Sequence, residues 1–110
     1  MKVNQEIRDI TEAIKAAVPV ERIYLFGSHA YGTPNDDSDY DFFVVIPDDS
    51  MRPIDAMKLA RRSLRTVDRK TPTDILADYS SRFDDRKQYN TLEKKIVNEG
   101  MVLYERQNAR

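Results

Sequence analysis

Residues 25–46, LFGSHAYGTPNDDSDYDFFVVI, decide the fold of this chain. The run Arg22–Phe26, which is rich in β-branched and aromatic residues and is stopped by Gly27, predicts a short strand. The unbroken apolar run Phe42–Ile46 predicts a second strand, because a central strand covered on both faces needs no polar alternation. Between the two lies a turn-rich segment. The stretch therefore predicts a strand, a loop and a central strand.

Three amphipathic helices are predicted outside this stretch. The first, ended by Pro19, has apolar residues three and four apart: Val3, Ile7, Ile10, Ile14 and Val18. The second runs from Met51 to about Arg69, with Pro53 in its first turn. Its apolar positions are Ile54, Met57, Ala60, Leu64 and Val67.

The third helix is predicted to begin at Ser81 and to end at Gly100 as the C′ residue. Asp84, three residues after Ser81, completes a weak capping box. Its apolar positions are Tyr89, Leu92, Ile96 and Val97. Further strands are predicted at about Thr73–Tyr79 and over MVLYE, residues 101–105. The element order predicts an α/β (α+β) fold, a small mixed sheet with helices packed on it, as a single domain over residues 1–110.

The composition excludes several classes of protein. With 18 basic and 19 acidic residues the formal net charge is −1, which argues against non-specific nucleic-acid binding. The absence of cysteine excludes a disulfide scaffold, a zinc–thiolate site and a cysteine nucleophile. No apolar segment resembles a signal peptide or approaches the roughly 18 residues that span a bilayer. We therefore expect a cytoplasmic protein without a membrane partner.

Acidic residues cluster where the second strand begins. Asp39 and Asp41 stand two apart on the predicted strand, so both side chains are expected on one face. Neighbouring carboxylates raise each other's pKa, and a hard cation such as Mg²⁺ or Mn²⁺ removes that conflict. Asp74, early in the third strand beside Ile75, is the expected third carboxylate. A buried charge at that position would be costly without a partner.

The Gly27-Ser28 pair lies directly after the first strand. Gly27 allows a sharp turn and a close approach of the backbone to a ligand. If the segment from Ser28 is helical, its free N–H groups and its hydroxyl would hold phosphate oxygens. A phosphate cradle beside paired carboxylates is the arrangement that holds a metal-bound nucleoside triphosphate, with two ions about 3.5–4 Å apart.

Gly27-Ser28, ten further residues and then Asp39-Tyr40-Asp41 resemble the signature of the polymerase-β-type nucleotidyltransferase superfamily. With Asp74, the chain resembles the small stand-alone members called minimal nucleotidyltransferases. For this composition the spaced motif arises by chance with a probability of roughly two in a thousand. The specific motifs cover only residues 25–46 and Asp74. His29 stands where relatives often have arginine.

The resemblance implies a polymerase-β-like core with defined residue roles. Gly27 and Ser28 would contact the triphosphate, and Asp39 and Asp41 would ligate two Mg²⁺ or Mn²⁺ ions. Asp74 would bind the catalytic metal or help to deprotonate the attacking hydroxyl. The expected reaction moves a nucleoside monophosphate, AMP if the substrate is ATP, to an acceptor hydroxyl and releases pyrophosphate.

The resemblance also implies a partner. Minimal nucleotidyltransferases are commonly antitoxins that adenylylate a HEPN-domain ribonuclease toxin on tyrosine, and the short chain leaves no room for an acceptor domain. A homo-oligomer could instead build the pocket of a small-molecule, aminoglycoside-like nucleotidyltransferase. A non-catalytic nucleotide-binding antitoxin is the alternative from another functional class.

Simpler interpretations stand beside these. The cluster of Asp36, Asp37, Asp39 and Asp41 would also suit a solvated turn. An EF-hand calcium loop is discarded, because Phe42 stands where that loop needs glycine. His29 is expected to be a loop side chain, and Asp74 would also serve as a capping residue. The basic residues Arg61, Arg62 and Arg65 are expected on the solvated face of a helix.

Overall fold

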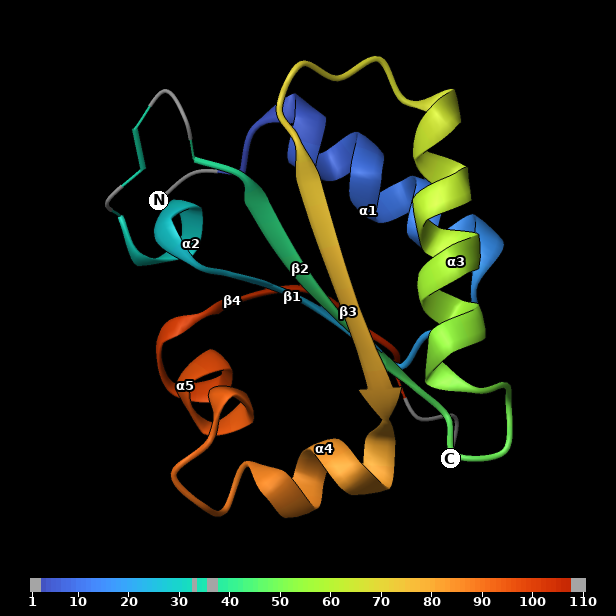
Figure 1. Ribbon diagram of the computed structural model, residues 1–110, viewed down its shortest axis with the longest axis vertical. Helices are drawn as coiled ribbons and strands as arrows, with labels where there is room; N and C mark the ends of the chain where they lie inside the picture. Colours follow the sequence, from blue (N-terminus) through green and yellow to red (C-terminus); the bar gives the residue numbers. More distant parts are fainter. Residues whose placement is uncertain (1–2, 33, 36–37, 108–110) are drawn as a thin grey trace.

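A computed structural model describes residues 3–32, 34–35 and 38–107 (Figure 1). The helices are α1 (Gln5–Ala17), α2 (Ser28–Tyr31), α3 (Pro53–Ser63), α4 (Ser80–Arg86) and α5 (Leu92–Glu99), with a 3₁₀ turn η1 (Leu64–Thr66) after α3. The strands are β1 (Arg22–Phe26), β2 (Tyr40–Ile46), β3 (Thr73–Tyr79) and β4 (Met101–Glu105). None of the helices in these ranges is long and apolar enough to cross a membrane.

The four strands form one mixed sheet in the order β3-β2-β1-β4. β1 is antiparallel to β2 and to β4, whereas β2 and β3 are parallel. The chain reaches β3 from β2 by crossing over through α3, as parallel neighbours require. The strands β1, β2, β3 and β4 lie where the sequence predicts them. The mixed sheet with packed helices confirms the predicted fold class.

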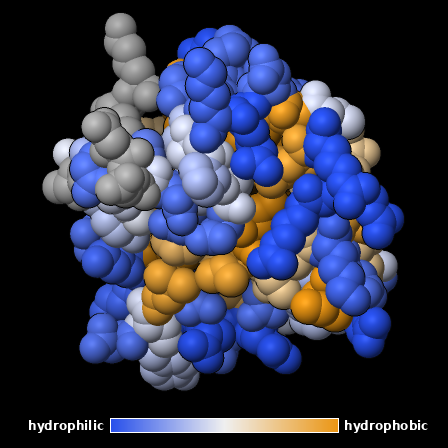
Figure 2. All heavy atoms as spheres, turned by 45° about the horizontal axis from the view of Figure 1, so that its top comes forward, coloured by the Kyte–Doolittle hydropathy of each residue, from blue (hydrophilic) through white to orange (hydrophobic). Residues whose placement is uncertain are grey.

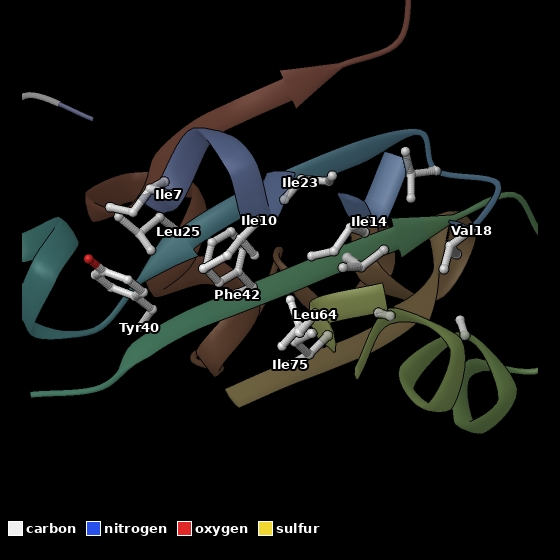
Figure 3. Packing of buried hydrophobic residues seen from close by; sticks show 14 of the residues in the cluster. Ile7, Ile10, Ile14, Val18, Ile23, Leu25, Tyr40, Phe42, Leu64 and Ile75 are labelled. Carbon is white, nitrogen blue, oxygen red and sulfur yellow. The ribbon is translucent and has the colours of Figure 1, made fainter. Parts of the chain in front are cut away.

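One face of the sheet packs against α1, α3 and η1. The apolar stripe of α1 lies over residues of β1, β2 and β3, as Figure 3 shows. The fully buried members include Ile7, Ile10, Ile14, Ile23, Leu25, Phe42 and Ile75. Burial of each such side chain contributes roughly 1.5–3 kcal/mol of hydrophobic stabilisation before conformational entropy is deducted. The predicted amphipathic first helix is confirmed.

The other face carries a smaller core under α4 and α5. Phe83 of α4 stacks on Tyr24 with ring centroids 5.3 Å apart and tilts against Phe43 at 5.1 Å. Ile96 of α5 and Val45 complete this cluster. These residues cover β1 and β2, but on the same face of β3 Asp74 is exposed and Leu76 is 40% exposed. The beginning of β3 is therefore open on the α4–α5 side.

The predicted third helix is wrong in its extent. Two helices replace it, and α5 starts at a new N-cap, Thr91, whose side chain accepts a hydrogen bond from the N–H of Lys94. Ser81 and Asp84 form no capping box, because Asp84 instead pairs with Arg22 at 3.0 Å. The turn between the helices leaves Tyr89 60% exposed.

Two further details of the helices differ from the sequence prediction. Gly100 ends α5 with an extended backbone (φ −76°) rather than the left-handed one of a C′ glycine. Its small size has another reason, since an added Cβ would lie 2.9 Å from the carbonyl oxygen of Leu25. In α3, Ile54 is 46% exposed, and Ala56 and Ala60 are buried in its place. Small residues there bring the helix close to the sheet.

The basic residues of α3 and η1 lie on the solvent side, as predicted. Arg61, Arg62 and Arg65 are all exposed. Hydrophilic residues cover most of the right-hand side of Figure 2, the side on which Figure 1 draws α3. Pro53 occupies the first turn of this helix, where its missing N–H costs no hydrogen bond.

Candidate active site

Gly27 joins β1 to α2 in a conformation that only glycine adopts readily. Its φ is +76° and its ψ −165°, and an added Cβ would overlap the carboxylate of Asp41. The Gly27 carbonyl accepts hydrogen bonds from the N–H groups of Ala30 and Tyr31, both at 3.0 Å, so the predicted short helix begins directly at Ser28. The glycine therefore allows both the turn and the close approach of the Asp41 side chain.

Asp41 and Asp74 lie side by side on neighbouring strands. Their Cα atoms are partners in the parallel register of β2 and β3, and their side chains share the sheet face opposite α1. On the other side of Asp41, Phe26 at the end of β1 is its antiparallel partner. The sheet thus places the Gly27 turn and both carboxylates at one end of three adjacent strands.

The electrostatics of Asp41 reflect this crowding. Burial raises the pKa of Asp41 above its usual range, and the negative charges of Asp74 and Asp39 raise the pKa further, while His29 acts in the opposite direction. Two like charges at this spacing oppose each other's ionisation. The three predicted carboxylates are thus near enough to influence one another.

Asp39 and Asp74 differ in detail from the sequence prediction. β2 begins at Tyr40, so Asp39 lies just before the strand rather than on it. Asp74 is on strand β3 as predicted, but it is exposed, so its charge carries no burial cost. Asp36 and Asp37, the other members of the predicted acidic cluster, lie outside the described residues.

His29 belongs to α2 and faces the start of β2. Its Nε2 lies 3.2 Å from the carbonyl oxygen of Ser38, which can only accept, so Nε2 carries the proton in this contact. The His29 ring meets the Tyr40 ring edge-on with centroids 4.6 Å apart. These contacts make His29 part of the packing between α2 and β2, not a free loop side chain.

A cation next to α2 has no counterpart in the sequence prediction. Lys95 of α5 places its Nζ 4.9 Å from the centroid of the Tyr31 ring. Tyr31 ends the short helix that begins at Ser28. No local pattern could reveal this pair, because it depends on how α5 packs over β1.

The residues present fit a divalent cation, although no group of three potential ligands in the described part of the chain converges closely enough to hold an ion alone. Asp41 and Asp74 supply hard carboxylate oxygens in adjacent positions, and the pKa of Asp41 is raised first by burial and then by the charges of Asp74 and Asp39. Magnesium sites commonly combine one or two carboxylates with substrate phosphates and water. The donor set therefore suits a cation that binds together with a phosphorylated substrate.

Comparisons with known proteins bear on the family and the fold of the chain. A family model described as "Polymerase beta, Nucleotidyltransferase" matches residues 8–109. No curated protein sequence matches the chain significantly. Among solved structures, a toxin–antitoxin complex crystallised with AMP-PNP contains a similar chain (TM-score 0.60, 22% identity, 94% of this chain and 76% of that one).

Two other solved structures have the same fold. A variant of the toxin–antitoxin MntA–HpeT with two Asp-to-Glu changes matches with a TM-score of 0.61 and 24% identity, covering 96% of this chain and 76% of that one. A protein from Sulfolobus solfataricus assigned to the nucleotidyltransferases matches with a TM-score of 0.59 and 20% identity, covering 96% and 91%.

Proposed function

This chain belongs to the polymerase β nucleotidyltransferase family, and we propose that it transfers a nucleoside monophosphate from a metal-bound nucleoside triphosphate to an acceptor hydroxyl. The observation that carries the proposal is the pairing of Asp41 with Asp74 beside the Gly27 turn. Under this proposal residues 1–110 act as one nucleotidyltransferase domain. ATP is the proposed substrate, which makes the transferred group AMP.

Asp39, Asp41 and Asp74 are the residues proposed to hold two Mg²⁺ or Mn²⁺ ions. The ions would neutralise charge on the α-phosphate and on the entering and leaving oxygens of an in-line displacement. The crowding of negative charge at Asp41 supports this assignment, because such charge calls for a cation.

The phosphates of the substrate are proposed to lie against Gly27, Ser28 and the first turn of α2. The N–H groups of Ala30 and Tyr31 already donate to Gly27, so the N–H groups of Ser28 and His29 are the ones proposed to meet the phosphates at the N-terminal end of α2. Lys95 is the proposed cationic contact of the triphosphate, since its ammonium already lies against Tyr31 of the same helix. Under this proposal, the close approach of Gly27 to Asp41 sets the phosphate contacts of α2 beside the metal ligands.

The reaction itself is a substitution at the α-phosphorus. The acceptor oxygen forms a bond to the α-phosphorus, the bond to the bridging oxygen of the β-phosphate breaks, and pyrophosphate leaves with that electron pair. The proton of the acceptor hydroxyl goes to a carboxylate oxygen of Asp74. Asp74 suits this role because it is exposed on the open side of β3, where an acceptor can reach it.

The acceptor is proposed to be a tyrosine of a HEPN-domain toxin, with this chain as the antitoxin. The support is that two of the similar structures are toxin–antitoxin complexes, one of them holding AMP-PNP. The exposed surface at Asp74 and Leu76 leaves space for a macromolecular acceptor. The protein partner would present the acceptor hydroxyl on the open side of β3.

Transfer can be tested with two differently labelled batches of ATP. The protein is incubated with Mg²⁺, the product of the neighbouring gene, and ATP labelled at either the α- or the γ-phosphate. Label from the α position should appear on the partner as additions of one AMP mass, and γ label should not. Asp41→Asn should abolish the transfer while remaining folded.

Other outcomes would redirect the assignment. Transfer of γ label would indicate a kinase. Undiminished transfer by the Asp41→Asn variant would show that the carboxylate assignment is wrong. Binding of the partner without any transfer, with Mg²⁺ or Mn²⁺ and each nucleoside triphosphate, would favour a non-catalytic antitoxin.

A further inference from the structure

A carboxylate on α1 connects the beginnings of β2 and β3. Glu6 accepts hydrogen bonds through Oε1 from the hydroxyl of Tyr40, at 2.7 Å, and from the hydroxyl of Thr71, at 3.0 Å. Its second oxygen, Oε2, accepts from the backbone N–H of Lys70. One side chain therefore holds the first residue of β2 and the two residues that precede Pro72 and β3.

The tyrosine in this network is fixed from several sides. Tyr40 is 2% exposed, and its hydroxyl also accepts a hydrogen bond from the amide of Asn4 at 3.0 Å. Asn4 is the N-cap of α1 and accepts from the N–H of Ile7 at 2.8 Å. The N–H of Tyr40 donates to the carbonyl of Pro72 at 3.0 Å. The beginning of β2 is thus attached to α1 and to the segment before β3.

These hydrogen bonds attach the two segments that carry the candidate carboxylates, the beginning of β2 and the beginning of β3. Tyr40 stands between Asp39 and Asp41, and Thr71 lies shortly before Asp74. β2 and β3 are parallel, so no tight turn links their beginnings, and the chain between them runs through α3 and η1. The side chain of Glu6 adds to the strand pairing, because it has hydrogen bonds both to Tyr40 at the beginning of β2 and to residues 70–71 before β3.

Glu6 does not act as a ligand of the site. The Tyr40 ring points to the α1 face of the sheet, where it joins Phe42 in the main core, whereas Asp41 points to the opposite face. The three donors satisfy the Glu6 carboxylate, and hydrogen bonds to an ionised acceptor are stronger than neutral ones. Any effect of Glu6 on the site is therefore transmitted through Tyr40 and the residues 70–71.

We propose that Glu6 is a positioning residue for the transfer reaction, which holds the beginnings of β2 and β3 at the spacing that lets Asp39, Asp41 and Asp74 share cations. This inference rests on the proposed function. Glu6 contacts none of the three carboxylates, so its effect on metal affinity should be smaller than the roughly tenfold to hundredfold change seen when a direct hydrogen-bond partner of a ligand is replaced.

Two variants remove different parts of the connection and keep the shape of the side chains. Glu6→Gln removes the negative charge: its NH₂ group can turn toward the hydroxyls of Tyr40 and Thr71, which also accept, and the N–H of Lys70 is left with a neutral acceptor, so the charge-assisted hydrogen bonds are lost. Tyr40→Phe removes the hydroxyl but keeps the ring that packs against His29. Glu12→Gln is the matched control, because Glu12 lies on the same helix and pairs only at the surface, with Lys15 at 3.2 Å.

The primary measurement is the Mn²⁺ concentration at which the intact protein and each variant half-maximally bind α,β-methylene-ATP, an analogue that cannot transfer its monophosphate, because the site suits a cation that binds together with phosphates. Glu6→Gln and Tyr40→Phe should raise this Mn²⁺ concentration by a few fold, less than the roughly tenfold or more that follows when a direct hydrogen-bond partner of a ligand is replaced. In the transfer assay they should need correspondingly more Mg²⁺ for half-maximal rate, and excess Mg²⁺ should restore the rate. Glu12→Gln should behave as the unaltered protein.

The result that overturns the inference is an unchanged Mn²⁺ concentration in both folded variants, or an equal rise in the Glu12→Gln control. Circular dichroism establishes that each variant is folded, and Tyr40→Phe decides the matter if Glu6→Gln does not fold. An absence of transfer by the unaltered protein would refute the proposed function instead, because binding of the analogue with Mn²⁺ tests Glu6 without any reaction.

Discussion

The Cα atoms of Asp41 and Asp74 face each other across the parallel strands β2 and β3, with both carboxylates on the same side of the sheet. A protein gains nothing in stability from two adjacent acids, one of them with its pKa raised by burial and by its neighbours. Their juxtaposition is best explained by a cation and a phosphorylated substrate, and it leads to predictions that separate stability from activity.

Removing one of the paired charges should stabilise the metal-free protein. Asp41→Asn keeps the shape of the side chain and removes repulsion with Asp74 and Asp39, so its Tm should equal or exceed that of the unaltered protein. Mg²⁺ with a nucleoside triphosphate should raise the Tm of the unaltered protein but not of the variant. Differential scanning fluorimetry measures both. A clearly lower Tm for Asp41→Asn without metal would contradict the prediction.

The stability difference between these two proteins should depend on pH. The pKa of Asp41 is raised in the folded protein above its ordinary value of 3.8. As the pH rises past 3.8, the Asp41 carboxyl therefore loses its proton in the unfolded chain before it does so in the folded protein. The stability contribution of Asp41 is therefore lost as the pH rises through the folded pKa. The advantage of Asp41→Asn in urea unfolding should grow with pH through this window and then level off. A constant difference from pH 3 to pH 7 would contradict this.

Glu6 should show the opposite dependence on pH. The hydrogen bond from Tyr40, followed by the one from Lys70, lowers the pKa of Glu6 below its ordinary 4.5. Its contribution to stability is present above pH 4.5 and is lost as the pH falls through the lower folded pKa. In urea unfolding, Glu6→Gln should be less stable than the unaltered protein at pH 7, and the difference should shrink below pH 4.5. A difference that grows toward acid pH would refute the argument.

The two glycines with positive φ, Gly27 and Gly32, provide a pair of variants to compare. Gly27→Ala should reduce transfer by about a hundredfold or more, because its Cβ would displace the Asp41 carboxylate. Gly32 has a similar φ of +85°, but an added Cβ there meets nothing within 4 Å. Gly32→Ala should therefore cost about 1–2 kcal/mol of unfolding free energy for the left-handed backbone alone and keep its activity. If both variants lose activity equally, backbone strain and not displacement of the Asp41 carboxylate would be the cause of the lost transfer.

Neighbouring lysines of α5 test the proposed triphosphate contact. Lys95→Met should raise KM for the nucleoside triphosphate about tenfold, the size expected for the loss of one charge-assisted hydrogen bond. Lys94 is also exposed, but it points about 100° away around the helix, so Lys94→Met should leave KM unchanged. Steady-state kinetics with pyrophosphate detection provides the measurement. If KM rises equally in both, general surface charge and not a specific contact would explain the effect.

Much of the fold could be predicted from local patterns. The strands Arg22–Phe26 and Thr73–Tyr79 have the predicted bounds, because β-branched and aromatic runs bounded by turn residues are local properties. The prediction was wrong between Ser81 and Gly100, where the apolar spacing continued through a break. The choice of Thr91 as a new N-cap, and of Asp84 as a partner for Arg22, depends on tertiary contacts.

The candidate site could be predicted only in part for the same reason. The spacing of Gly27, Ser28, Asp39 and Asp41 is a property of the sequence, but the register that sets Asp74 beside Asp41 is a property of the sheet. Glu6 and Lys95 had no sequence signal, since each contacts the site region from a distant helix. Long-range pairs of this kind become visible only when the elements are packed together.

The uncovered beginning of β3 has a consequence for the chemistry of the isolated chain. β3 is an edge strand, and α4 and α5 leave its Asp74 and Leu76 exposed to solvent. Under the proposed reaction, water has the same access to Asp74 as an acceptor hydroxyl. The chain alone should then hydrolyse a nucleoside triphosphate slowly to the monophosphate and pyrophosphate. A docked acceptor would suppress this hydrolysis, because it would displace water from Asp74 and cover the open side of the active site.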